Sequence, residues 1–406
     1  MVRVTIIGQG YVGLPLAVEA AKAGFKVVGF DIDAKKVNKL KSGEIDFSGI
    51  NKRELLVLQS EGKLKFTDHL DNKDSSEIFI IAVPTPLDSD RKPDLSMLYN
   101  ACITIAEFAT KGSLIINEST SYIGNLRHLV RHTIDKNSKV DDLEYAVAPE
   151  RIDPGNTSWN ISNTPRYVSG LTANASKRAL EFYGSFCKEV HEVATPEILE
   201  AAKLFENTFR HINIALVNEF ANLAHQFNLS AHDVINIASS KPFGFMPFYP
   251  SIGVGGHCIP VDPAYLNYSA SNVGLKFNFV NLADEINYLT PQKIAMRIIN
   301  QFSGNSIGMR VQLAGIAYKP NIADVRESPA LALMNELEKK GCILSWHDPL
   351  VEEHNNQKTT PLDPTVDLGL IIAPHDAIDF SIWKQSGTKV FDLSADSKNY
   401  GWPKFL

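Results

Sequence analysis

A cysteine in a glycine-rich segment is the strongest sign of chemistry in this sequence. Cys258 lies in the stretch GVGGHCIPVD, residues 253–262. Because glycines lack side chains, a ligand and backbone amides can approach closely there. Cys102, Cys187 and Cys342 have apolar or mixed neighbours, which favours a buried packing role for them. The Cys258 thiolate is therefore the candidate nucleophile, and it could attack an aldehyde to form a hemithioacetal.

Groups that could assist this thiolate occur on a helix predicted from Thr195 onward. Thr195 suits a helix cap and Pro196 a first turn, and apolar residues then recur at helical spacing, which predicts one long, largely buried helix. Lys203 and Asn207 are four residues apart and share a face of that helix. Lys203 could favour the thiolate, and both could stabilise an oxyanion. An ordinary surface lysine is the alternative for Lys203.

Two carboxylates and a histidine are the candidate acids and bases. Asp262 follows the thiol by four residues, and Glu150 follows a predicted strand, so either could act as a base or orient a water. His257 is next to the thiol, but adjacent side chains usually diverge, which favours a packing or backbone role. Spacing alone leaves these roles open.

The start of the chain has the pattern of a dinucleotide-binding turn. Gly8-Gln9-Gly10-Tyr11-Val12-Gly13 follows the first predicted strand directly and opens a helix, where the glycines allow a tight turn, a close pyrophosphate and close helix packing. Asp31 ends the second strand and could accept hydrogen bonds from an adenosine ribose. Its charge would repel a 2′-phosphate, which favours NAD over NADP, although Lys35 and Lys36 soften that preference.

The chain alternates apolar, β-branched runs with helical segments, which predicts parallel sheets of the α/β class. The third and fourth strands are followed by Pro84-Thr85-Pro86 and Glu118-Ser119-Thr120, at the edge where such folds bind ligands, and simple loops are the alternative there. We predict three domains: 1–194, a central helical domain at 195–302 that holds the cysteine segment, and 303–406. The expected strands are 2–7, 26–30, 78–83, 113–117, 145–148, 311–317, 342–346, 368–373 and 389–393, and a second helical stretch covers 277–302.

Composition excludes several classes of function. The 406 residues carry a net charge of -6 without a block of like charges, which argues against a nucleic-acid partner. The sequence shows neither a signal peptide nor an apolar run of about 20 residues, so we expect a cytoplasmic protein without a membrane partner. The four cysteines form no CxxC pair, so no metal site is expected.

The glycine turn, the segments 149–151 and 203–210, and the cysteine stretch together resemble the UDP-glucose/GDP-mannose dehydrogenase family along essentially the whole chain. The resemblance implies two Rossmann-like domains joined by a long central helix, a homodimer, and oxidation of the primary alcohol of a UDP-sugar to a carboxylate with two NAD per sugar. It also implies that the carboxyl-terminal domain binds the UDP-sugar.

The resemblance also implies roles for individual residues. It makes Cys258 the nucleophile and assigns the other catalytic roles to Lys203, Asn207, Asp262, Glu150 and Thr120. It implies cofactor contacts at Gly8, Gly10, Tyr11, Val12, Gly13, Asp31, Thr85, Thr120 and Arg326. It implies substrate contacts at Glu150, Arg151, Lys203, Asn207, Arg210, Phe248, Tyr249, Gly255 and Lys319.

The segments 150–156 and 241–250 look like those of the UDP-N-acetylglucosamine 6-dehydrogenase branch, which favours a UDP-N-acetylhexosamine substrate for polysaccharide synthesis. UDP-N-acetylmannosamine dehydrogenases share the cysteine stretch and are the nearest competitor. A one-step β-hydroxyacid dehydrogenase and a non-catalytic nucleotide-sugar sensor are further alternatives. Many relatives add an arginine from the second subunit, but no arginine occurs here between Arg210 and Arg297, which leaves Lys241 or another mode of binding.

Overall fold

The computed structural model describes residues 2–45, 50–71, 74–152, 156, 158–396 and 398–406. The chain forms two compact units, Met1–Glu206 with Ala264–Gly274, and Asn207–Pro263 with Leu275–Leu406. Each unit contains a largely parallel sheet with helices, which confirms the predicted α/β fold class. The three-domain division stays a prediction. Residues 153–155 of the segment that resembles the N-acetylglucosamine branch lie outside the described residues.

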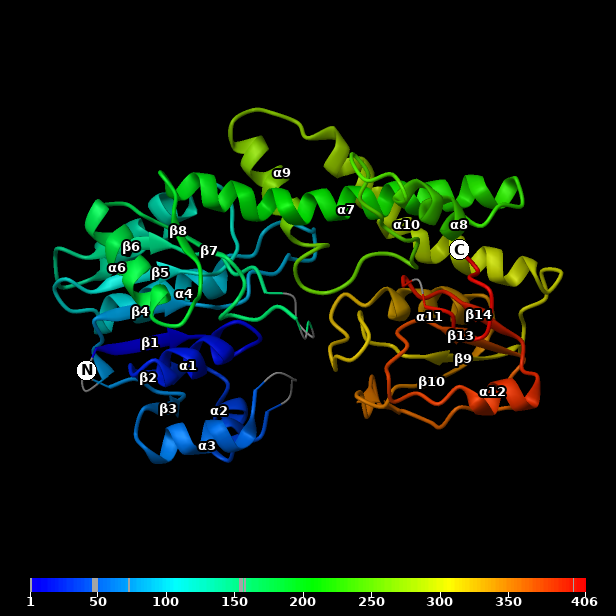
Figure 1. Ribbon diagram of the computed structural model, residues 1–406, viewed down its shortest axis with the longest axis horizontal. Helices are drawn as coiled ribbons and strands as arrows, with labels where there is room; N and C mark the ends of the chain where they lie inside the picture. The colour runs from blue at the N-terminus through cyan, green and yellow to red at the C-terminus, as the bar shows by residue number, and fades with distance from the viewer. Residues whose placement is uncertain (1, 46–49, 72–73, 153–155, 157, 397) are drawn as a thin grey trace. The chain divides into compact units, whose positions relative to one another are not determined.

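The first unit is built on a Rossmann-like sheet (Figure 1). Within the described residues, eight strands follow the order β3-β2-β1-β4-β5-β6-β7-β8; the pair β6-β7 is antiparallel, and β8 runs parallel to β7. The elements are β1 Arg3–Ile7, α1 Gly13–Lys22, β2 Lys26–Phe30, α2 Ala34–Lys41, α3 Lys52–Ser60, β3 Leu64–Thr67, β4 Ile78–Ile81, α4 Ser96–Phe108, β5 Leu114–Asn117, the π-helical turn η2 Leu126–Arg131, α5 His132–Asn137, β6 Glu144–Val147, β7 Arg166–Gly170, α6 Ala173–Gly184 and β8 Val190–Glu192.

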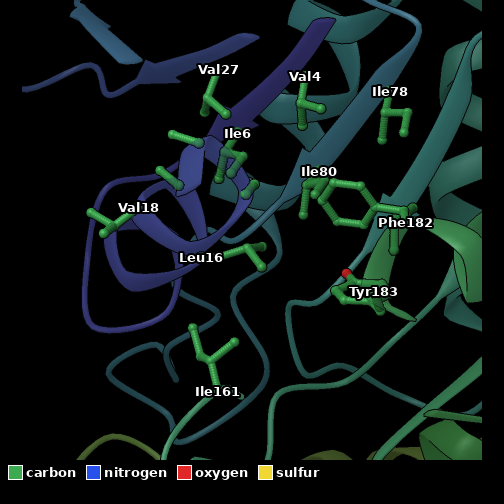
Figure 2. Packing of buried hydrophobic residues seen from close by; sticks show 14 of the residues in the cluster. Val4, Ile6, Leu16, Val18, Val27, Ile78, Ile80, Ile161, Phe182 and Tyr183 are labelled. Carbon is green, nitrogen blue, oxygen red and sulfur yellow. The ribbon is translucent and has the colours of Figure 1, made fainter. Parts of the chain in front are cut away.

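Both faces of this sheet are buried, which explains its apolar strands. Side chains alternate between faces along a strand. Val4 and Ile6 of β1 therefore join α1 and α6 in one core, as Figure 2 shows with Leu16 of α1 and Phe182 of α6. Ile7, the residue after Ile6, joins α4 and η2 in a second core on the other face. Two covered faces require near-continuous apolar runs such as IFII in β4.

The second unit has a smaller parallel sheet with the order β10-β9-β13-β14. Apolar side chains of α10, α11 and the strands form its main core, which includes the buried Trp346. The remaining elements of the chain are α7 Pro196–Gln226, α8 Ala231–Ser239, α9 Asp262–Asn272, α10 Asn278–Asn300, β9 Arg310–Ala314, α11 Pro329–Lys339, β10 Ile343–His347, β11 Glu353–His354, β12 Gln357–Lys358, β13 Leu368–Ile371, α12 Ser381–Ser386 and β14 Val390–Asp392.

The two sheets share a local plan at the end of their first strand. Gly8 follows β1 and Gly315 follows β9, with φ angles of 94° and 82°. A Cβ atom would lie 2.4 Å from a backbone carbonyl oxygen at Gly8 and 2.0 Å from one at Gly315, so a larger residue does not fit at either position. Asp31 and Asp348 each follow the second strand of their sheet. The two units thus share a glycine directly after the first strand and an aspartate directly after the second, although the connection to the next helix is longer in the second unit.

The environments of these two aspartates differ. Asp348 is fully buried, and the Nε2 atom of His375 lies 3.0 Å from its Oδ2 atom. His375 Nδ1 accepts a hydrogen bond from the N–H of Asn321, so Nε2 carries the proton that is donated to Asp348. The Asp348 carboxylate also accepts backbone N–H groups of Ile316, Ala317, Leu350 and Val351. Protein groups therefore occupy this carboxylate on all sides.

The long helix α7 contains 31 residues, as its periodicity predicts, but the expectation that it is largely buried is wrong for this chain. Phe209, Leu216, Leu223 and Phe227 are between 42% and 68% exposed. Hydrophobic periodicity shows that a helix has an apolar face, but it does not show what covers that face. Across the described ranges, we find no helix with both the length and the apolar character needed to cross a membrane.

Candidate active site

The first glycine turn fits a dinucleotide pyrophosphate. A Cβ atom at Gly13 would lie 1.8 Å from the carbonyl oxygen of Gly8, so α1 can start this close to the turn only with glycine there. At Gly10, by contrast, a Cβ atom would have no neighbour within 4 Å. Open space over the middle glycine is what a closely approaching phosphate needs. Tyr11 and Val12 complete the turn before α1 and are partly exposed.

Asp31 lies at the end of β2 beside this turn, where a ribose would bind. Its carboxylate accepts the N–H groups of Gln9 at 2.9 Å and Asp33 at 3.0 Å. Lys36 Nζ lies 2.9 Å from Asp31 Oδ2. A carboxylate has about four acceptor positions, so room for a ribose hydroxyl remains. Ile32 is 82% exposed next to it and could cover an adenine ring, a contact that the sequence analysis missed.

The loops after β4 and β5 are joined to each other at the same edge of the sheet. Thr85 donates its hydroxyl to the carbonyl of Thr120 at 2.7 Å. Ser119 accepts the N–H of Val83 at 3.0 Å and donates its hydroxyl to the Val83 carbonyl at 2.8 Å. The buried Tyr265 of α9 donates its hydroxyl to the Thr85 carbonyl at 3.2 Å. The structure therefore brings the two predicted threonines together beside the glycine turn.

Glu150 and Arg151 follow β6 and face different surroundings. Glu150 is 8% exposed, and one of its oxygens accepts the N–H of Ile152. Arg151 is partly exposed and pairs with Glu206 of α7 at 2.7 Å, with its guanidinium over the ring of Tyr167. A substrate contact by Arg151 would have to compete with Glu206.

The nucleophile candidate lies in a tight turn of the second unit. The carbonyl of Cys258 accepts the N–H groups of Val261 at 3.1 Å and Asp262 at 2.8 Å, so residues 258–262 form one helical turn. This turn places Cys258 and the buried Asp262 on one face. Asn207 of α7 donates its side-chain amide to Asp262 Oδ2 at 2.5 Å. Three predicted catalytic residues are thus connected through this turn.

The glycines before the cysteine allow close packing on the loop that follows β9. A Cβ atom at Gly255 would lie 2.7 Å from the Tyr318 side chain, and one at Gly256 would lie 2.9 Å from the Tyr318 ring. His257 Nδ1 lies 3.2 Å from Arg326 Nη2, and Arg326 also binds Asp324 at 2.6 Å. This contact agrees with a packing role for His257. It places Arg326 in the same unit as Cys258, and its predicted contact with the cofactor stays a prediction.

Other predicted substrate residues are distributed over the helical part of the chain. Lys203 is partly exposed one turn before Asn207 on α7, and Arg210 is exposed on the same helix. Phe248 packs edge-on against Phe209, with ring centroids 5.8 Å apart. Tyr249 stacks on His232 and donates its hydroxyl to Asn236 at 2.8 Å. Lys319 lies in the loop after β9 and is partly exposed.

The predicted residues divide between the two units. Thr85, Thr120, Glu150, Arg151 and Lys203 belong to the first unit with the glycine turn and Asp31. The second unit contains Asn207, Arg210, Phe248, Tyr249, Gly255, Cys258, Asp262, Lys319 and Arg326.

Two buried carboxylic acids of the first unit were given no role of their own by sequence reasoning. Glu118 follows β5, and burial raises its pKa to about 7, an effect that the Arg166 guanidinium opposes. Glu200 lies on α7 one turn before Lys203, and burial raises its pKa to about 7 as well, although backbone hydrogen bonds from Leu126 and Gly124 oppose the change. Perturbed acids of this kind cluster at functional sites. The ESTS motif, residues 118–121, was the only signal for Glu118.

Three stretches of the chain match the domains of one enzyme family. Residues 2–187 match the NAD binding domain of the UDP-glucose/GDP-mannose dehydrogenase family, residues 197–288 its central domain, and residues 312–388 its UDP binding domain. The chain belongs to this family. The family comprises UDP-glucose and GDP-mannose dehydrogenases, and because this chain matches both its NAD binding and its UDP binding domains, it is an NAD-dependent UDP-sugar dehydrogenase. The family sets aside the β-hydroxyacid dehydrogenase and sensor alternatives.

Individual relatives of this UDP-sugar dehydrogenase differ in their sugar. The chain is 36% identical to a UDP-N-acetyl-D-mannosamine dehydrogenase of Pyrococcus horikoshii, over 86% of this chain and 84% of the relative. It is 32% identical to a UDP-N-acetyl-D-glucosamine 6-dehydrogenase of Salmonella typhi, over 100% of this chain and 95% of the relative. A solved structure of UDP-D-ManNAc dehydrogenase from Pyrococcus horikoshii superposes with a TM-score of 0.85 at 31% identity, covering 98% of this chain and 97% of that one.

Proposed function

We propose that the protein oxidises the C6 alcohol of a UDP-N-acetylhexosamine to a carboxylate in two steps at Cys258. The first oxidation gives an aldehyde, and the Cys258 thiolate adds to its carbon to form a hemithioacetal. Loss of a second hydride leaves a thioester, which water cleaves to the carboxylate with return of the thiol. NAD, when bound, accepts the hydride of each oxidation, and each also releases a proton.

The hydrogen bond between Asn207 and Asp262 carries this proposal. One N–H of the Asn207 amide binds Asp262 Oδ2 at 2.5 Å, and an amide NH₂ group has a second hydrogen that can bind an oxyanion. The same bond fixes the Asp262 carboxylate on the face of the turn that carries Cys258. Lys203, one turn earlier on α7, adds a positive charge for the thiolate and the developing oxyanion. Nucleophile, oxyanion donor and carboxylate therefore occur as one connected set.

UDP-N-acetylglucosamine is the first candidate substrate, because the segments 150–156 and 241–250 resemble that branch. UDP-N-acetylmannosamine is the second, because relatives with this activity are as similar to the chain as the glucosamine enzymes are. Comparing kcat/KM for the two compounds, with UDP-N-acetylgalactosamine and UDP-glucose beside them, separates the candidates. A preference of more than about tenfold, equal to about 1.4 kcal/mol, would identify the sugar.

The experiment that tests the chemistry counts NADH. Limiting UDP-sugar should yield about two NADH per sugar, because both oxidations use the same carbon. The Cys258→Ser variant should lose this turnover while keeping its circular dichroism spectrum. One NADH per sugar would remove the thioester step, and an active serine variant would move the nucleophile elsewhere. Cys342→Ser, at a buried cysteine outside the site, is the matched control.

The homodimer expected from the family resemblance has a suitable surface on α7. Phe209, Leu216 and Leu223 recur every seven residues, and Phe227 follows four residues later, so the exposed side chains form one stripe on the helix. A second copy of the chain could cover this stripe. Leu216→Glu should then give a monomer by light scattering, while the same charge at His225, on the opposite side of the helix, should not. The cytoplasmic location stays a prediction.

A further inference from the structure

Four buried side chains meet at the carboxyl edge of the first sheet: Glu118, Glu150, Arg166 and Tyr183. Glu118 and Glu150 follow the parallel strands β5 and β6. Arg166 is the first residue of β7, and because β7 is antiparallel to β6, its start lies beside the end of β6. Tyr183 comes from α6, which packs against the sheet (Figure 2). The change of strand direction between β6 and β7 therefore brings a guanidinium to the edge where ligands bind in such sheets.

Arg166 is shared between the two carboxylates. Its Nη2 atom lies 2.5 Å from Glu118 Oε2, and its Nη1 atom lies 3.6 Å from Glu150 Oε2. The guanidinium lies 4.3 Å from the centre of the Tyr183 ring, and the Tyr183 hydroxyl donates to Glu118 Oε1. Side-chain exposure is 6% for Arg166, 0% for Glu118 and 10% for Glu150, so water screens these charges weakly.

One guanidinium cannot fully balance two buried carboxylates. Burial raises the pKa of Glu118 to about 7, and the charge of Glu150 adds to this effect while Arg166 opposes it. Near neutral pH Glu118 is therefore protonated in part of the molecules. In these molecules Glu150 is the charged carboxylate that pairs with Arg166. Glu150 Oε1 is held by the N–H of Ile152, whereas Glu150 Oε2 accepts no hydrogen bond from the described residues. This oxygen is buried, and its one ion-pair partner among the described residues is Arg166.

We propose that Arg166 is a positioning residue that orients Glu150 to activate the water that cleaves the Cys258 thioester. The inference rests on the proposed function. In this step Glu150 takes a proton from water as the water oxygen bonds to the thioester carbon, and the bond from carbon to Sγ then breaks with release of the thiolate. Hydrolysis follows both oxidations. Loss of Arg166 should therefore slow hydrolysis and leave the two oxidations unchanged.

Rapid-mixing kinetics with the full-length enzyme separates the steps. Arg166→Lys should keep a fast burst of two NADH per subunit and slow the steady state by about 10- to 100-fold, as misplacement of a reacting group does. A mass adduct equal to the acyl group should accumulate on Cys258 at the same time. Glu150→Gln should behave alike, because it removes the base itself. A merely structural defect would lower the burst as well.

Two further variants make the result decisive. Arg178→Lys is the matched control: Arg178 binds the carbonyls of Gly112 and Glu77 before β5 and β4, at the other edge of the same sheet, and its loss should leave burst and steady state unchanged. If Arg166→Lys does not fold, the double variant Arg166→Met with Glu118→Gln replaces it, because removing both partners leaves no unpaired Glu118 charge buried.

The outcomes distinguish the two proposals. An adduct in Glu150→Gln together with wild-type hydrolysis in the Arg166 variants would overturn the role of Arg166 and leave the proposed function intact. No adduct in any variant, including Glu150→Gln, would overturn the thioester itself. An adduct in both the Glu150 and the Arg166 variants, absent from Arg178→Lys, is the expected result.

Discussion

Glu200 offers a quantitative test of how burial controls ionisation in the first unit. Its carboxylate on α7 accepts the N–H of Gly124 at 2.6 Å and that of Leu126 at 2.9 Å, and the residue is 5% exposed. These bonds hold the start of η2 and the end of the loop that carries Thr120. The Glu200→Gln substitution keeps the size of the side chain, but it removes the titration and one of the two acceptor oxygens.

The expected effect follows from the pKa of Glu200. Burial raises it from the ordinary 4.5 to about 7, with Leu126, Gly124 and Arg127 opposing the change and Glu197 adding to it. Between these values the folded protein keeps a proton that the unfolded chain has lost. The contribution of Glu200 to stability is therefore fully present below about pH 4.5 and is lost as the pH rises through about 7, a change of about 3 kcal/mol.

Amide hydrogen exchange of β4 and β5 measures the free energy of opening in this unit, with wild type and variant compared at the same pH. From about pH 5 to about pH 8, Glu200→Gln should become more stable relative to wild type by about 2 to 3 kcal/mol. Glu197→Gln, one turn earlier, is the control, because the pKa of Glu197 is lowered through its contacts, Arg127 among them, despite its burial. An unchanged difference between wild type and Glu200→Gln at the two pH values would refute the reasoning.

Three other substitutions give separate tests. Gly10→Ala should weaken NAD binding by about tenfold or more, measured by titration of protein fluorescence, at nearly constant stability, because the added Cβ enters open space. Gly8→Ala should instead lower the free energy of unfolding by about 2 kcal/mol or more, because the added Cβ meets a carbonyl oxygen and Gly8 has a positive φ. Asp31→Ala should raise kcat/KM with NADP, and adding Lys36→Met should cancel the gain, since Lys36 already lies at this position. Burial raises the pKa of Asp348, but the His375 hydrogen bond and backbone donors lower it below its usual range. The contribution of this carboxylate to folding stability is therefore present above about pH 4 and lost at lower pH. In an acid titration followed by circular dichroism, Asp348→Asn should lose stability less steeply than the wild type, and an equally steep loss would contradict the assignment.

Local sequence signals were sufficient for the central strands of both sheets, but β3, β7 and β8 at the two sides of the first sheet were not predicted. The run Lys26–Phe30 was predicted as a strand with the bounds that β2 has, and the runs for β5 and β6 differ by one residue at their ends. Parallel strands covered on both faces need continuous apolar side chains, and this requirement is visible without any partner. The glycine pattern was also visible locally, although only the steric limit at Gly13 is set within the turn, since a Cβ atom at Gly8 would meet the carbonyl of the distant Ala82.

Features that depend on distant contacts were not predictable in this way. The sequence RYVSG of β7 gives no sign that the strand reverses, and Tyr183 contacts Glu118 across 65 residues. The buried acids Glu118 and Glu200 were missed for the same reason, because their pKa depends on what the fold places around them. The catalytic set around Cys258 was found because its members are close in the chain or share α7, and the roles of these residues remain predictions.

Asp31 and Asp348 occupy equivalent positions in the two sheets, but their different surroundings mean that they cannot bind a nucleotide in the same way. At the end of β2, the acid retains an acceptor for an incoming hydroxyl. At the end of β10, an imidazole and four peptide groups saturate it. Any discrimination between ribonucleotides by the second sheet must therefore come from groups outside this aspartate.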